Sequence, residues 1–92
     1  MGEKAENKVK DYLINNGFNI EFQGGNGNFI DMIFGCDLIV YRKDIGYKSI
    51  QVKSYLPKQE NIEHYKINWI AISDGNITIL DKNTFQPINI NG

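Results

Sequence analysis

The chain has 92 residues, which is the length of one domain with one compact core. Its composition, 41% hydrophobic and 23% charged residues, is typical of a globular protein and excludes a disordered or fibrous chain. Ten basic and eleven acidic residues give a formal net charge of -1, which argues against a protein that coats nucleic acid through bulk electrostatics alone.

Cysteine content and hydropathy favour the cytoplasm. A single cysteine, Cys36, cannot form an internal disulfide, and no Cys/His cluster has the spacing of a zinc site. No apolar run approaches the ~20 residues of a membrane helix, and the start of the chain lacks the apolar segment of a signal peptide. We therefore expect a cytoplasmic protein without a membrane partner.

The first predicted element is an amphipathic helix from about Glu3 to Asn16. Gly17 is a natural stop, because glycine readily adopts the left-handed conformation that ends many helices. The apolar residues that recur at helical spacing are Ala5, Val9, Tyr12 and Leu13.

A half-buried strand is predicted from Phe18 to Phe22, where apolar and polar residues alternate. Glycine and asparagine at 24–28 then predict an irregular loop. The apolar stretch 29–36 around Asp31 leaves three structures open, namely a strand, an edge segment or a close approach to the next strand.

A β-hairpin is predicted in the middle of the chain, with strands at 37–42 and 48–55 and turn residues at 43–46. Pro57 ends the second strand, because proline cannot donate a hydrogen bond to a sheet. The polar stretch 58–65 predicts either a short surface helix or a loop.

The last predicted strands cover 68–73 and 76–80 and are joined by an Asp-Gly turn. No pattern predicts an element after Asp81. The order of elements predicts a single α/β (mixed α+β) domain over residues 1–92, with the N-terminal helix packed on a mixed, mainly antiparallel sheet.

Three polar residues of the predicted hairpin are expected to converge. Gln51 and Lys53 share a face, because side chains two positions apart on a strand point the same way. With the turn centred near Ile45, paired residue numbers sum to about 90 and Asp37 lies opposite Lys53. Residues paired across an antiparallel ladder share a face, so Asp37, Gln51 and Lys53 should lie close together.

Glu6 is the helix residue that we expect to join this group. At about 100° per residue it lies roughly 75° from the centre of the apolar stripe, so it borders the buried face. It can then reach over the sheet edge toward Asp37, whereas Glu3 faces water.

These side chains suit metal-dependent hydrolysis. Two carboxylates and an amide oxygen are the hard ligands that Mg²⁺ or Mn²⁺ prefers. A neighbouring lysine can orient or deprotonate a water that attacks a phosphodiester, while the metal stabilises charge on the phosphate. The expected reaction is therefore phosphodiester hydrolysis.

An aspartate at the start of a hydrophobic strand, a hairpin and then Gln51-Val52-Lys53 resemble the motif of the PD-(D/E)XK nucleases, the restriction-endonuclease-like superfamily. The first helix is similar to the opening helix of archaeal Holliday junction resolvases. The resemblance covers residues 2 to about 55. The helix positions that carry it are Gly2, Ala5, Glu6, Val9, Leu13, Gly17 and Phe18.

The resemblance implies a restriction-endonuclease-like fold and a DNA endonuclease that depends on Mg²⁺ or Mn²⁺. It implies that Glu6 and Asp37 are metal ligands and that the Val52 carbonyl is a further ligand. Gln51 takes the position of the motif's acidic residue, and Lys53 is the catalytic lysine. Because one site cuts one strand, symmetrical cleavage of duplex or branched DNA implies a homodimer.

Two departures from the motif leave a second hypothesis open. Cys36 stands where the motif often has proline. Gln51 replaces the usual acid and removes one negative charge from the site. The second hypothesis is a catalytically inactive nuclease-like domain that binds DNA or another protein.

Three further alternatives remain open. Asp31 is a rival for the motif aspartate, although the adjacent hairpin partner favours Asp37. An unrelated small α/β interaction protein is favoured if Glu6 and Lys53 lie far apart. Aromatic residues can stack on nucleic-acid bases or belong to the core and sheet surface; these are Tyr41, Tyr47, Tyr55, Tyr65 and Trp69.

Overall fold

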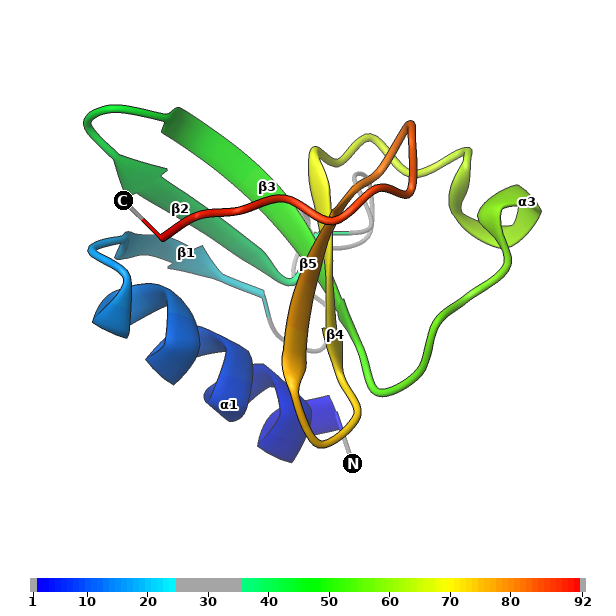
Figure 1. The fold of residues 1–92 in the computed structure, drawn as a ribbon, viewed down its shortest axis with the longest axis horizontal. Coiled ribbons are helices and arrows are strands. Elements are labelled where there is room, and N and C mark those ends of the chain that lie inside the picture. Colours follow the sequence, from blue (N-terminus) through cyan, green and yellow to red (C-terminus); the bar gives the residue numbers. More distant parts are fainter. Residues whose placement is uncertain (1, 25–35, 92) are drawn as a thin grey trace.

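The computed structural model describes residues 2–24 and 36–91, and this part of the chain forms two helices and five strands (Figure 1). The predicted strands and first helix are confirmed, with ends that differ by one or two residues. The polar stretch 58–65, for which a short surface helix or a loop was predicted, contains a short helix. The elements are α1 (Gly2–Asn15), β1 (Asn19–Gln23), β2 (Leu38–Arg42), β3 (Gly46–Lys53), α3 (Gln59–Ile62), β4 (Trp69–Ser73) and β5 (Ile77–Asp81).

The strands form one sheet in the order β1-β2-β3-β4-β5. β3 and β4 are parallel, and the other neighbouring pairs are antiparallel. A parallel pair needs a crossover connection, which residues 54–68 with α3 provide. The fold is therefore α+β, with an N-terminal helix packed on a five-stranded mixed, mainly antiparallel sheet, and the prediction is confirmed at this level.

Helix α1 ends in a Schellman motif centred on Gly17. The Phe18 amide donates to the Leu13 carbonyl at 3.0 Å. The Gly17 amide donates to the Ile14 carbonyl, also at 3.0 Å. Gly17 has a φ of 89°, which glycine adopts without the steric cost that a Cβ would add. The predicted stop at Gly17 is confirmed, and the turn brings Phe18 into the core.

The larger apolar cluster lies between α1 and the sheet. Ala5, Val9 and Leu13 of the predicted helix stripe are buried in it, and Tyr12 packs against it half-buried. The sheet contributes alternate residues, as expected for one buried face of each strand. These are Leu38, Val40, Ile50, Val52, Trp69, Ala71 and Ile79.

A smaller apolar cluster covers the other face of the sheet, so α1 and α3 lie on different sides (Figure 1). Its buried members are Cys36, Ile62, Ile67, Ile70, Ile72 and Leu80. The two clusters together fix the orientation of β3. Its Ile50 and Val52 face α1, and its Gln51 and Lys53 face away from α1, which confirms the predicted alternation.

Arg42 joins the end of α1, the hairpin and the C-terminal segment. Its Nη1 donates to the carbonyls of Asn16 at 2.6 Å and Ile90 at 2.7 Å. Its Nε and Nη2 donate to the two carboxylate oxygens of Asp44, at 2.6 and 3.0 Å. The guanidinium also lies 4.7 Å from the ring centre of Phe18. A single side chain therefore holds three segments that are distant in the sequence.

The predicted register of the β2–β3 hairpin is wrong by two residues. Leu38 pairs with Ile50, so that paired numbers sum to 88. The turn is shorter than predicted because Gly46, with a φ of 90°, already pairs as the first residue of β3. The paired positions end at Leu38 and Ile50, and the Asp37 amide also bonds to the Ile50 carbonyl, so Asp37 does not pair with Lys53 as predicted. The predicted faces survive, because a shift by an even number leaves every side chain on its side of the sheet.

The segment after β5 belongs to the fold, although no pattern predicted it. Leu80 forms a bridge with Pro87, and the Ile88 amide donates to the Ile79 carbonyl at 2.8 Å. Ile90 is only 1% exposed. Two isoleucines among polar residues are too short a pattern to predict a strand, so this contribution to the core is visible only in the structure.

Part of the predicted chain falls outside the described residues. This applies to Asp31 and to nearly all of the predicted loop and apolar stretch at 24–36. The choice of Asp37 over Asp31 therefore stays a prediction. Within residues 2–24 and 36–91, no helix has both the length and the apolar character needed to cross a membrane.

Candidate functional site

β3 continues three residues beyond its pairing with β2, because β2 begins at Leu38 opposite Ile50. We call the position beside Gln51, Val52 and Lys53, where β2 has not yet begun, the strand fork. An edge of β3 at the fork lacks a neighbouring strand among the described residues, so its backbone groups there need other partners.

Asp37 supplies one of these partners. Its backbone amide donates to the Ile50 carbonyl at 2.8 Å, which holds the residue against β3. Its Oδ2 accepts a hydrogen bond from the Val52 amide at 2.9 Å. The carboxylate is thus fixed at the fork by charge-assisted bonding to the backbone, in a half-buried position.

The Val52 carbonyl faces the same fork. The N–H and C=O groups of one residue in an extended strand project to the same edge, and the Val52 amide is directed at Asp37. The backbone oxygen predicted as a ligand is therefore on the correct edge of β3. Its role as a ligand stays a prediction.

Gln51 lies on β3 directly before Val52 and carries a buried oxygen. Its Oε1 is closed off from solvent and has no hydrogen-bond partner among the described residues. A buried polar oxygen without a partner carries a free-energy cost, which a cation or a donor would relieve. The position predicted to contact a metal is thus also a position where the fold leaves a bare oxygen.

Lys53 is the last residue of β3 and shares a face with Gln51. It is half-buried, and its backbone neighbour on β4 is Ile72. Asp37 does not pair with Lys53 as predicted, because its amide bonds to the Ile50 carbonyl. Its carboxylate bonds to the Val52 amide, so Lys53 is the next residue along β3 from this contact.

Glu6 comes from the other side of the sheet. It is half-buried on α1, at the border of the buried stripe as predicted, and its Oε1 is closed off from solvent. Because α1 covers the Ile50 and Val52 face, Glu6 starts on the face opposite to Gln51 and Lys53. Shared ligation with Asp37 therefore requires the Glu6 carboxylate to meet it at the edge of β3, within the fork.

The oxygen atoms of the four predicted ligand residues suit a hard divalent cation. They are the carboxylates of Glu6 and Asp37, the amide oxygen of Gln51 and the Val52 carbonyl, and Mg²⁺ and Mn²⁺ bind such groups. The unsatisfied Gln51 oxygen fits this use. Among the described residues, however, no group of three or more His, Cys, Asp or Glu side chains could hold a metal ion. A metal held by the described residues alone would therefore need neutral oxygen ligands beside the carboxylates.

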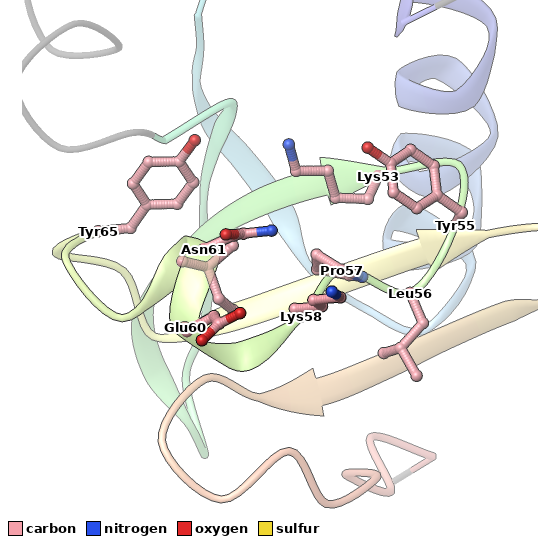
Figure 2. Close-up of a pocket in the computed structure, with 9 residues that line it drawn as sticks. Lys53, Tyr55, Leu56, Pro57, Lys58, Glu60, Asn61 and Tyr65 are labelled. Carbon is pink, nitrogen blue, oxygen red and sulfur yellow. The ribbon is translucent and has the colours of Figure 1, made fainter.

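A polar groove opens beside Lys53, between the end of β3 and α3 (Figure 2). We call it the Lys53 groove; its volume is about 450 Å³. Its polar lining residues are Lys53, Tyr55, Lys58, Glu60, Asn61 and Tyr65.

No sequence pattern predicted this groove. Tyr55 and Tyr65 were expected only as aromatic residues that either stack on bases or belong to the core and sheet surface. The available signal was Pro57, which separates a strand from a polar stretch with tyrosine and lysine on both sides. Their convergence depends on the path of the β3–β4 crossover, which a local pattern does not encode.

Comparisons with protein-family models, with curated proteins and with solved structures found no match to this chain.

Proposed function

We propose that the protein is a metal-dependent DNA endonuclease of the PD-(D/E)XK type, nearest in pattern to Holliday junction resolvases. One observation carries the proposal. The Asp37 carboxylate is fixed at the strand fork by the Val52 amide, and Val52 is flanked on β3 by Lys53 and by Gln51, whose buried oxygen has no hydrogen-bond partner among the described residues. The restriction-endonuclease-like fold belongs to the same proposal.

The residues at the fork have separate tasks in this mechanism. Glu6, Asp37, Gln51 and the Val52 carbonyl would hold Mg²⁺ or Mn²⁺, which when bound offsets negative charge on the scissile phosphate. The Val52 amide holds one oxygen of the Asp37 carboxylate in place at the fork. Lys53 is placed to hydrogen-bond the attacking water or a non-bridging phosphate oxygen.

Cleavage assays on labelled DNA test this proposal. We expect cutting of linear duplex, single-stranded, flap or four-way-junction DNA only with Mg²⁺ or Mn²⁺. Asp37→Asn and Lys53→Ala should each lower the rate by about 100-fold or more. Lys43→Ala is the matched control, because this exposed lysine lies in the hairpin turn away from the fork. No cutting of any substrate by the folded wild-type protein would reject the enzyme.

A second candidate function is a nuclease-like module that binds DNA or a protein without cutting. Two observations favour it, namely the amide at position 51 and the lack of a three-residue acidic or histidine cluster in the described chain. Calorimetry with Mn²⁺ separates the candidates. The enzyme requires a Mn²⁺ site in the wild type, whereas the binding module is supported if Mn²⁺ binds only to Gln51→Glu.

The proposed enzyme acts as a homodimer. One fork can cut one strand, so paired cuts in a duplex or a junction need two copies related by symmetry. Light scattering, alone and with junction DNA, should show two chains per complex. A monomer at high protein concentration and on DNA would contradict the dimer but leave single-strand cutting possible.

A further inference from the structure

The Lys53 groove combines the contacts that an unpaired nucleotide needs. Figure 2 shows Tyr55 and Tyr65 on the two sides of the Lys53 side chain, with Asn61 between Tyr65 and Lys53. Lys58 adds a second cation, against the single carboxylate of Glu60. The groove therefore presents aromatic rings, an amide and an excess of positive charge to one opening.

The tyrosines differ in how firmly they are held. Tyr65 is half-buried, packs against the smaller apolar cluster and makes an edge contact with His64 at 4.5 Å between ring centres. Tyr55 is 64% exposed, so most of its ring is free to meet a ligand. One wall of the groove is thus braced by the core, and the other is an open aromatic surface.

The size of the groove favours a single base over a duplex. Its volume of about 450 Å³ is in the range of small-molecule sites. A base inside a duplex is stacked and paired on both sides, so it cannot enter a concave site without being extruded. An unpaired base has free faces for stacking on tyrosine and a free edge for the amide of Asn61.

We propose that the Lys53 groove binds one unpaired nucleotide of a DNA strand, with its base on Tyr55 and a flanking phosphate near Lys58. This inference rests on the proposed function, because it places the bound nucleotide next to the phosphate at Lys53. Among the substrates named above, it favours DNA with a single-stranded segment, such as a flap, and makes fully paired duplexes and junctions, whose paired cuts call for a dimer, the weaker substrates.

Binding without cleavage tests the groove separately from the enzyme. The probes are a fluorescein-labelled single-stranded oligothymidylate and a labelled hairpin duplex of the same length, measured by anisotropy in EDTA at fixed salt. Tyr55→Ala should weaken binding of the single strand by about 5- to 150-fold, the range expected for loss of one stacked base. Binding of the duplex should not change.

Tyr47→Ala is the matched control, because Tyr47 is also 64% exposed but lies at the other end of β3. It should leave single-strand binding unchanged. A second pair of variants removes charge: Lys58→Ala should reduce the slope of log affinity against log salt by about 0.7, and Lys43→Ala should not. Circular dichroism confirms that each exposed-residue variant is folded.

Several outcomes would overturn the inference: no binding of the oligothymidylate, equal wild-type affinity for single strand and duplex, or equal losses in Tyr55→Ala and Tyr47→Ala. Metal-dependent cutting together with any of these outcomes would reject nucleotide binding in the groove and support the endonuclease. Tyr55-dependent binding without cutting by the wild type would support nucleotide binding in the groove and reject the endonuclease.

Discussion

The Asp37 carboxylate takes the place of a backbone acceptor. It accepts a hydrogen bond from the Val52 amide at a point where β2 has no carbonyl to offer. The carboxylate therefore adds one bond to the ladder between β2 and β3. The same oxygen pair is the candidate anionic ligand at the fork. A structural role and a catalytic role therefore fall on one side chain, and substitutions must be chosen to separate them.

Two substitutions of Asp37 make this separation. Asp37→Ala leaves the half-buried Val52 amide without its acceptor and should lower the free energy of unfolding by about 1–3 kcal/mol. Asp37→Asn keeps an oxygen acceptor, so its loss should be under about 1 kcal/mol. Both should abolish Mn²⁺ binding. Urea denaturation and calorimetry measure the two effects, and equal destabilisation by the two variants would contradict the backbone role.

Asp44 provides a pH-dependent contribution to stability. The hydrogen bond from the Arg42 guanidinium lowers the pKa of this exposed carboxyl from its usual 3.8 in the folded protein. A lowered pKa in the folded state stabilises the fold above the unfolded-state pKa, and the contribution is lost as the pH falls through the folded-state pKa.

The stability difference between wild type and Asp44→Asn should therefore be constant above about pH 5 and shrink as the pH falls below the usual carboxyl pKa. Thermal unfolding from pH 2 to pH 7 measures it. Added salt should reduce the difference, since the pair is exposed to solvent. A stability difference that does not change with pH would show that the contribution of the Arg42–Asp44 pair does not depend on the charge of Asp44.

At the scale of elements, the glycines at two turns differ only in their surroundings. Gly17 and Gly46 have φ values of 89° and 90°, so an added Cβ strains both backbones alike. At Gly17 that Cβ would also lie 3.3 Å from Cδ of Arg42, whereas at Gly46 nothing lies within 4 Å.

Gly46→Ala should lower the free energy of unfolding by about 1–2 kcal/mol, which is the usual cost of a left-handed L-residue. Gly17→Ala should lower it further, because Arg42 must shift and its bonds to Asn16 and Ile90 weaken. Denaturant titrations of both variants give the difference. Equal losses of unfolding free energy in the two variants would mean that the Arg42 side chain can move away from the added Cβ without weakening its hydrogen bonds.

The elements and faces could be predicted from the sequence because they follow from short periodic patterns. Ile50 and Val52 alternate with Gln51 and Lys53, and this period is unaffected by an even shift in register. The exact register of the hairpin, and with it the position of Asp37 along β3, could not be predicted, because it depends on whether Gly46 belongs to the turn or to the strand.

The Lys53 groove could not be predicted for a different reason. Its lining residues come from the end of β3, the crossover and α3, and only the parallel pairing of β3 with β4 brings them together. No local pattern places Glu6 and Gln51 on different sides of β3, because the face that a helix covers is a property of the packed sheet.

On the scale of the whole molecule, the C-terminal segment closes the core between α1 and the sheet. Ile90 is buried in the same cluster as Val9 and Leu13, and its carbonyl accepts a hydrogen bond from Arg42. The last residues of the described chain and the first helix therefore depend on each other, although they lie at opposite ends of the sequence.

Ile90→Ala should lower the free energy of unfolding by about 2–5 kcal/mol, the range measured for buried isoleucine and leucine truncations. The adjacent Asn89 is exposed, so Asn89→Ala should change it by less than about 0.5 kcal/mol. Urea denaturation compares the two. A small effect at Ile90 would show that the C-terminal segment is dispensable for the core.

The buried Cys36 has a practical consequence for the strand fork. It is the only cysteine in the sequence, its side chain is 0% exposed, and it directly precedes Asp37. A thiol reagent can reach it only when this corner of the sheet opens, so its labelling rate is proportional to the population of the open form. The labelling rate of Cys36 therefore reports how often the fork opens. It can be measured with and without Mn²⁺, and no cysteine has to be introduced.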